Sequence, residues 1–114
     1  MSVLPVKRVE SMNGGAGHVL ILPLYTEEQM HGYCRLYAQV TLEPGCEIGW
    51  HIHHNEAESY FVVSGCGEYN DNGNKRIIKV GDVTYTPDGC GHGLLNTSKD
   101  VNLVIMANII PYAK

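Results

Sequence analysis

The chain has 114 residues, a formal net charge of −4 and no run of lysines or arginines. This length suits a single domain over residues 1–114, and a composition that is 44% hydrophobic and 18% charged is typical of a soluble globular protein. The acidic balance argues against nucleic acid as a partner, because binding phosphates requires clustered cations. No apolar stretch approaches the roughly 20 residues that span a bilayer, so we expect no membrane partner.

The beginning of the chain lacks the apolar segment of a signal peptide, because one proline and three charged residues between positions 5 and 10 interrupt it. The default expectation is therefore a cytoplasmic protein. The four cysteines agree, since they are widely spaced and form no Cys-x-x-Cys pair. We expect free, mostly buried thiols, with Cys90 close enough to His92 in the sequence to be a candidate pocket residue.

Val19–Leu22 is the first predicted strand, and Pro23 ends it. Thr26–Gly32 is the one helical signal along the chain. Thr26 suits the N-cap position, Gln29 follows three residues later, two glutamates lie in the first turn, and a glycine ends the segment. This pattern predicts one or two helical turns.

The rest of the chain consists of short apolar or alternating runs that turn residues separate. These runs predict eight further strands: Tyr33–Leu42, Trp50–His53, Glu58–Val63, Glu68–Asn70, Lys75–Lys79, Val83–Thr86, Gly93–Asn96 and Val101–Ile109. Asn72-Gly73 is a strong hairpin signal, because both residues accept positive φ. Roughly nine short strands predict an all-β fold, either a sandwich or a barrel.

Three histidines and two glutamates lie between residues 51 and 58. His51 and His53 are two residues apart, so on a strand they point to the same face and could bind one ion. Glu58 leads directly into an apolar run, so we expect it to enter the interior and prefer it to Glu56 as a third ligand. His92 could supply a further nitrogen. The alternative is a set of exposed histidines, and these residues alone leave that choice open.

The glycines and the proline around these residues resemble the two conserved motifs of the cupin superfamily. The first motif is G-x5-H-x-H-x4-E-x6-G, from Gly45 to Gly65, and the second is G-x5-P-x-G-x2-H-x3-N, from Gly81 to Asn96. The resemblance implies a small antiparallel β-barrel of jelly-roll type with a metal in its mouth. It also implies the following metal ligands: His51, His53, Glu58 and His92.

A ligand set of three imidazoles and one carboxylate suits Mn, Fe, Co, Ni, Cu or Zn. The absence of a thiolate weakens the case for a structural zinc. If the ion prefers six ligands, four from the protein leave two positions for water, dioxygen or a bidentate oxygen ligand. Asn96 is interpreted as a structural residue or as one that orients a ligand.

Several other side chains have an open role. Tyr60 and Tyr85 either reach the metal or pack in the barrel wall, and Trp50 is expected in the core or at an interface. His54 and Glu56 are expected near the mouth.

His18 and His31 are expected at the surface. Arg35 could point inward, but the motifs themselves supply no cation, and this weakens a sugar-phosphate isomerase interpretation.

These features predict a metal-dependent enzyme acting on a small oxygenated molecule, of the dioxygenase, decarboxylase, isomerase or lyase type. The alternative is a non-catalytic metal- and ligand-binding protein, such as a sensor or carrier. A third possibility is a metal that mainly stabilises the barrel. No general base stands out, so the catalytic residues are unknown and whether the chain is an enzyme stays open. Size and family habit predict a homodimer.

Overall fold

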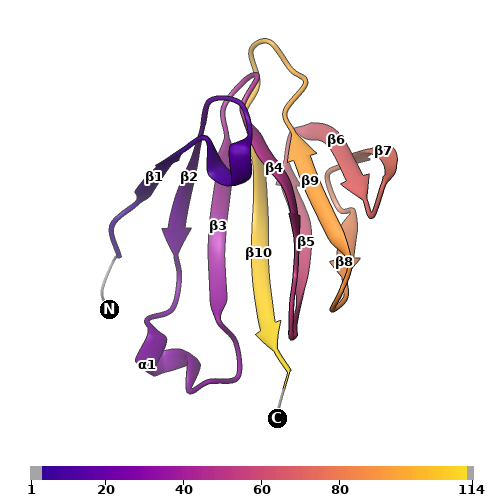
Figure 1. Cartoon of the computed structure of the whole chain (residues 1–114). Helices are drawn as coiled ribbons and strands as arrows, with labels where there is room; N and C mark the ends of the chain where they lie inside the picture. The colour runs from indigo at the N-terminus through magenta and orange to yellow at the C-terminus, as the bar shows by residue number, and fades with distance from the viewer. Residues whose placement is uncertain (1–3, 113–114) are drawn as a thin grey trace.

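The computed structural model describes residues 4–112, and nearly all of its regular structure is β-strand (Figure 1). The strands are β1 Lys7–Glu10, β2 His18–Pro23, β3 Leu36–Leu42, β4 Glu47–Ile52, β5 Glu56–Ser64, β6 Cys66–Asp71, β7 Asn74–Lys79, β8 Val83–Thr86, β9 Gly91–Leu95 and β10 Leu103–Pro111. They form a six-stranded sheet of order β1-β2-β3-β10-β5-β8 and a four-stranded sheet of order β4-β9-β6-β7. All pairings are antiparallel.

The prediction of an all-β jelly-roll barrel is confirmed, and each of the nine predicted strands has a counterpart. One strand, β1, was not predicted, because only Val9 among its four residues is even partly buried. It is a strand because its backbone pairs with the neighbouring strand β2, and its own sequence carries no strand pattern. Strand β4 begins three residues earlier than predicted and ends at Ile52, one residue earlier than predicted. His53 therefore lies just beyond its end.

The helical prediction is confirmed as a single turn, α1 Glu27–Met30. The Thr26 side chain accepts a hydrogen bond from the Gln29 backbone N–H at 3.1 Å, and the Thr26 N–H donates to the Gln29 side chain at 2.9 Å. This reciprocal capping box satisfies two N–H groups that have no partner within the helix. Within residues 4–112, no helix is long and apolar enough to cross a membrane.

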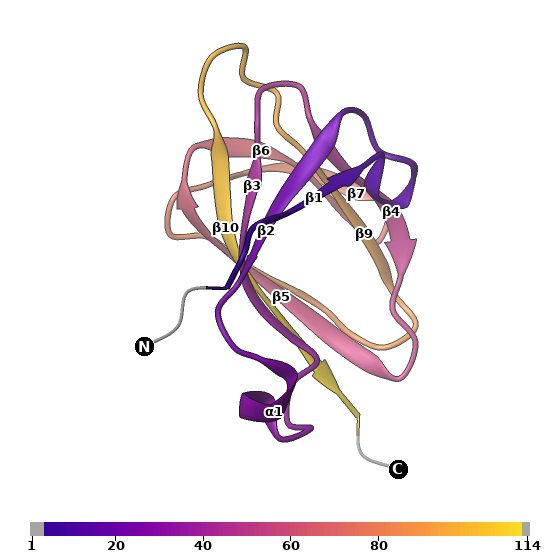
Figure 2. The ribbon, with the colours of Figure 1, turned by 90° about the vertical axis from the view of Figure 1, so that its left-hand side faces the viewer.

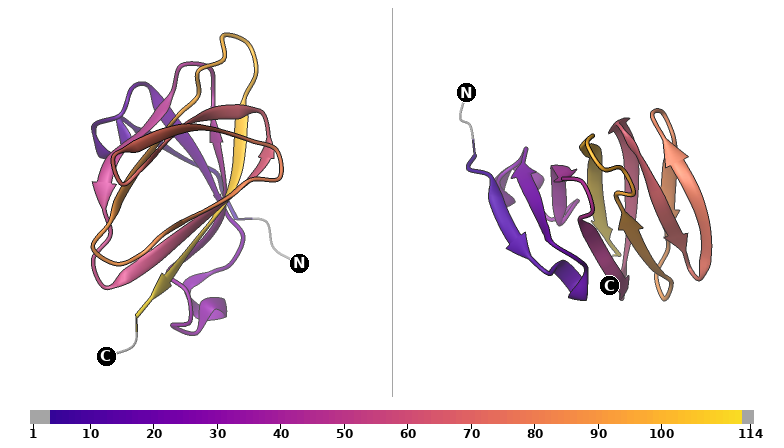
Figure 3. Two further views of the ribbon diagram at one scale, coloured as in Figure 1. Left: turned by 90° about the vertical axis from the view of Figure 1, so that its right-hand side faces the viewer. Right: turned by 90° about the horizontal axis from the view of Figure 1, so that it is seen from above.

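The two sheets face each other around a common interior (Figure 2). The view from the opposite side and the view from above show the same wrapping (Figure 3). Strict alternation along β10 buries the inward-facing residues, as its pattern predicts. The core comprises Val19, Ala38, Val40, Leu42, Cys46, Ile48, Tyr60, Val62, Tyr69, Ile78, Leu94, Leu103, Ile105 and Ala107.

A short 3-10 turn, η1 Met12–Gly14, lies against β4 and covers one end of this interior. Gly15 and Gly49 permit this contact, because neither has a Cβ between the two backbones. A Cβ at Gly49 would overlap the Asn13 carbonyl oxygen and come within 2.7 Å of the Gly15 nitrogen. The close approach of these backbones places Met12 and Asn13 over the cavity described below.

Two expectations about buried residues are wrong in part. Trp50 is not in the core: its side chain is 46% exposed, and its ring lies over Gly91, where an added Cβ would overlap it. All four thiols are free, as expected, but only Cys46 is buried, whereas Cys66 is exposed. Cysteine position alone does not reveal which face of a strand a thiol occupies.

Candidate metal centre

The backbone pairing of β4 with β9 brings the two sequence motifs together. In this register His51 lies directly opposite His92, although 41 residues separate them in the chain. The loop after β4 is held in the same way: the His53 N–H donates to the Cys90 carbonyl at 3.1 Å, and the Gly89 N–H donates to the His53 carbonyl at 2.8 Å. Gly89 has φ +83°, which explains the preference for glycine at this turn.

A second pair of backbone hydrogen bonds joins the start of the first motif to the end of the second. The Gly45 N–H donates to the Asn96 carbonyl at 3.1 Å, and the Asn96 N–H donates to the Cys46 carbonyl at 3.0 Å. The Asn96 side chain is buried and donates to the carbonyls of Leu42 and Val101. These contacts support the structural interpretation of Asn96.

Four side chains then converge on one point. One donor atom each of His51, His53, Glu58 and His92 lies within 4.8 Å of the other three. His92 Nε2 is 3.0 Å from His51 Nε2, 3.1 Å from His53 Nε2 and 3.0 Å from Glu58 Oε1. His53 Nε2 is 2.9 Å from the same carboxylate oxygen. This cluster could hold a metal ion, since its imidazole and carboxylate donors are those that transition metals prefer.

The partners of the outer ring nitrogens indicate which nitrogens carry protons. His51 Nδ1 is 2.8 Å from the Gly49 carbonyl, which can only accept a hydrogen bond. His53 Nδ1 is 2.6 Å from the Glu56 carboxylate. A proton on each Nδ1 satisfies these contacts and leaves both Nε2 atoms facing the Glu58 carboxylate, where each can donate a hydrogen bond if the ring is protonated or offer its lone pair to a metal ion. Positive charge among these groups, from protons or from a divalent metal, stabilises the arrangement.

The inner wall of the cluster is buried and polar. His92 is fully buried, and its Nδ1 lies 2.8 Å from the Tyr69 hydroxyl and 2.9 Å from the Thr86 hydroxyl. The Tyr60 ring stacks on the His92 ring with centroids 4.8 Å apart, and its hydroxyl is 3.4 Å from His92 Nε2. Tyr60 thus satisfies both sequence-based interpretations, because it packs in the wall and also reaches the donor cluster.

Burial and hydrogen bonding shift the protonation of these groups. Burial would by itself raise the pKa of Glu58, but hydrogen bonds with His51, His53 and His92 together hold that pKa far below its ordinary range. The hydrogen bond with Glu58 raises the pKa of His53 against the effect of burial. Burial lowers the pKa of His92 and raises that of Tyr60 well above its ordinary value. Tyr60 is therefore a neutral phenol at physiological pH.

Arg35 and Glu56 extend the cluster outward. Arg35 precedes β3, and its guanidinium binds both oxygens of Glu56, with Nε–Oε1 at 2.8 Å and Nη2–Oε2 at 2.9 Å. The hydrogen bond from Arg35 lowers the pKa of Glu56, so the carboxylate stays ionised and accepts from His53. Arg35 therefore orients a candidate ligand through Glu56, a role that the sequence motifs did not reveal.

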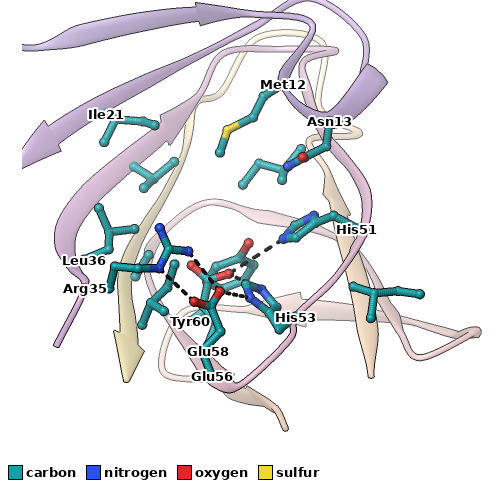
Figure 4. A pocket seen from close by; sticks show the side chains of 15 residues that line it. Met12, Asn13, Ile21, Arg35, Leu36, His51, His53, Glu56, Glu58 and Tyr60 are labelled. Atoms are coloured by element: carbon teal, nitrogen blue, oxygen red, sulfur yellow. Dashed lines mark hydrogen bonds and ion pairs between the residues drawn. The ribbon is translucent and has the colours of Figure 1, made fainter. Parts of the chain in front are cut away.

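The donor cluster opens onto a cavity of about 280 Å³ (Figure 4). His51, His53, Glu58 and Tyr60 line it, whereas His92 lies behind them. Figure 4 shows the Arg35 guanidinium on the same side of the cavity as Glu56 and Glu58. The full lining is Met12, Asn13, Ile21, Arg35, Leu36, Val40, Ile48, His51, Ile52, His53, Glu56, Glu58, Tyr60, Ala107 and Ile109.

Other candidates fall outside this lining. Tyr85 is 55% exposed on the outer face of the six-stranded sheet, and His54 is exposed beside His53. Cys90 does not line the cavity. His31 is exposed, as expected, but the His18 side chain is largely buried and its Nε2 contacts the Glu43 carboxylate.

Comparisons with known proteins bear on this arrangement. A family model for the cupin domain matches residues 38–108. The oxalate-binding protein of Thermotoga maritima is 38% identical over 109 residues, which are 96% of this chain and 89% of that protein. A solved structure described as a predicted oxalate decarboxylase, also from Thermotoga maritima, superposes with a TM-score of 0.91 at 37% identity and covers 97% of this chain and 99% of that one. KdgF from Halomonas superposes with a TM-score of 0.74 over 96% of this chain and 89% of its own, but at 18% identity this likeness shows the fold alone.

We predict that the untagged chain, purified without chelators, contains roughly one transition-metal ion per chain, and that His92→Ala contains less than about a tenth. The reason is that His92 Nε2 is in contact with all three other donors. Elemental analysis measures both contents. His54→Ala is the matched control and should keep the metal of the wild type, because His54 is exposed beside the site. Equal metal content in wild type and His92→Ala contradicts the assignment.

Proposed function

This chain belongs to the cupin family, and from that premise we propose that it binds a small carboxylate such as oxalate through a divalent transition metal. The proposed metal ligands are His51, His53, Glu58 and His92. The observation that carries the proposal is their convergence at the wall of an open cavity. The donor set suits Mn, Fe, Co, Ni or Zn. When bound, the ion would supply positive charge and exchangeable positions for ligand oxygens.

Arg35 supports an anionic ligand. It is the one lysine or arginine side chain among the residues that line the cavity. A guanidinium has five N–H donors, and the contacts with Glu56 use two of them. The remaining donors can bind carboxylate oxygens, and the pairing with Glu56 holds the guanidinium in place before a ligand arrives. The relative named for oxalate binding supports the same ligand chemistry.

The side chains of the cavity favour binding over turnover. Outside the proposed ligands, Glu56 is the one carboxylate in the lining. Both of its oxygens are engaged, with Arg35 and with His53. A carboxylate held in this way is a poor general base, because accepting a proton would break these charge-assisted hydrogen bonds.

A second candidate function is decarboxylation of oxalate to carbon dioxide and formate. This reaction requires that a proton replace the carboxyl group that leaves. The Tyr60 hydroxyl faces the donor cluster and is protonated, since burial raises its pKa well above the ordinary value. Likeness to the structure described as a predicted oxalate decarboxylase supports this candidate.

We also propose that two copies of the chain associate through the outer face of the six-stranded sheet. Phe61 lies opposite Val83 on one side and Met106 on the other, so the three side chains form one row across β8, β5 and β10. The large exposed apolar side chains of these three strands, together with the residue that follows β10, are Phe61, Val63, Val83, Tyr85, Ile110 and Tyr112. These side chains are 41–62% exposed, so only about half of the roughly 150–250 Å² of each aromatic one is available. The face therefore offers a few hundred Å² of the roughly 800 Å² that each partner contributes to a standard interface.

A cytoplasmic location is proposed from the state of the cysteines. The four thiols are free, which suits a reducing compartment. The expected lack of nucleic-acid and membrane partners stays a prediction from charge and hydropathy.

We predict that oxalate raises the melting temperature of the metal-loaded protein by several degrees at saturating concentration, because a ligand that binds only the folded state stabilises it. Thermal denaturation with Mn²⁺ or Co²⁺, with and without oxalate, measures the shift. The same samples are assayed for formate, whose formation would favour the decarboxylase candidate. Chelator-treated protein is the control and should show no oxalate shift. An equal shift in the treated protein, or none in either, contradicts the proposed function.

Arg35→Met is predicted to weaken oxalate binding to metal-saturated protein roughly tenfold or more, because charge-assisted hydrogen bonds to the ligand are lost. Calorimetric titration measures the Kd, and the metal content is determined separately because Arg35 also holds Glu56. Arg76→Met is the matched control, since Arg76 pairs with Asp71 at 2.6 Å outside the cavity. An unchanged oxalate Kd in Arg35→Met would show that Arg35 does not bind the ligand.

For the dimer, light scattering should give twice the chain mass for wild type and the single chain mass for Phe61→Lys. Burying a lysine at the centre of an apolar interface leaves its charge without water or a partner. Ile77→Lys is the control and should stay dimeric, because Ile77 is exposed on β7, in the other sheet. A monomeric wild type at about 100 μM, well above the Kd of a stable dimer, contradicts the proposal.

A further inference from the structure

The cavity beside the donor cluster has two chemically different parts. One part is polar and consists of His51, His53 and Glu58 together with Arg35, Glu56 and Tyr60. The other is apolar apart from Asn13, and Figure 4 shows Met12, Ile21 and Leu36 on the side of the cavity away from His53. The apolar lining comprises Met12, Ile21, Leu36, Val40, Ile48, Ile52, Ala107 and Ile109.

The cavity is larger than oxalate requires. A cavity of 280 Å³ has room for several water molecules. Oxalate has two carbons and four oxygens, and it would displace only some of that water. The rest would stay in contact with an apolar wall whose residues Met12, Ile21 and Leu36 are only partly buried by the protein itself. Covering that wall with a ligand's apolar atoms would be favourable.

We infer that the ligand of this site is a 2-oxo acid with an aliphatic or aromatic side chain, and this inference rests on the proposed function. A 2-oxo acid offers a metal the same pair of adjacent oxygens that oxalate offers, one from a carboxylate and one from the neighbouring carbonyl. Its carboxylate carries the charge that Arg35 complements. Its side chain replaces the second carboxylate of oxalate and lies against the wall formed by Met12, Ile21 and Leu36.

The test is a series of calorimetric titrations of the Co²⁺-loaded protein, which give the Kd of glyoxylate, pyruvate, 2-oxobutanoate and 4-methyl-2-oxopentanoate. Each added carbon that becomes buried should lower the Kd by roughly fourfold. The affinity should therefore rise at least about tenfold from pyruvate to 4-methyl-2-oxopentanoate. Absorption of the bound Co²⁺ reports independently that the acid reaches the metal.

Ile21→Trp narrows the apolar part and should remove most of the gain with chain length from pyruvate to 4-methyl-2-oxopentanoate, and its metal content is measured alongside. Ile77→Trp is the matched control, because Ile77 is 62% exposed on β7 and does not line the cavity. It should reproduce the wild-type series. If Ile21→Trp fails to fold, Ile21→Ala serves instead, and it should weaken 4-methyl-2-oxopentanoate more than pyruvate.

Two negative outcomes have different meanings. If oxalate binds in a metal-dependent way but the affinity does not rise along the series, the inference about the apolar side chain is wrong and the proposed function stands. If neither oxalate nor any 2-oxo acid binds in a metal-dependent way, the proposed function is wrong, and the further inference is wrong with it.

Discussion

The antiparallel pairing of β4 with β9 is the constraint on which the candidate site depends. It places His51 opposite His92, and the hydrogen bonds that join His53 to Gly89 and Cys90 continue the same contact beyond the end of β4. The histidines would no longer meet if this register slipped, because a shift by one residue turns a side chain to the other face of its sheet. The turn at Gly89 thus contributes to the site through its backbone, without a side chain of its own.

The electrostatics of the cluster follow from the groups behind it. The Gly49 carbonyl and the Glu56 carboxylate accept from His51 and His53, and so orient both rings with Nε2 toward Glu58. A dry cluster of acceptors is unfavourable unless a proton or a metal ion occupies it. The positive charge of Arg35 lowers the pKa of Glu56 and so keeps this carboxylate ionised. Because Glu56 also binds His53, the outer salt bridge and the inner donor set form one connected network.

Much of the fold could be predicted from the sequence, because alternation and turn residues are local patterns. The His-x-His spacing and a glutamate entering an apolar strand suggested three donors, but the spacing alone left exposed histidines as an alternative. The full set with His92 followed from the resemblance to the two cupin motifs. The role of Arg35 could not be predicted, since its partner Glu56 lies 21 residues away and no local pattern joins them. The position of Trp50 outside the core could not be predicted for a similar reason: its ring rests on Gly91 of another strand, a contact that exists only after β4 and β9 pair.

The central claim is that His51, His53, Glu58 and His92 hold one metal ion at the wall of the cavity. Anomalous diffraction, recorded above and below the absorption edge of the metal in crystals of the loaded protein, tests it most directly. The account predicts one strong peak per chain, about 2.0–2.2 Å from three imidazole nitrogens and one carboxylate oxygen. A loaded protein whose anomalous peak lies elsewhere, or that shows no peak among these four side chains, would contradict it.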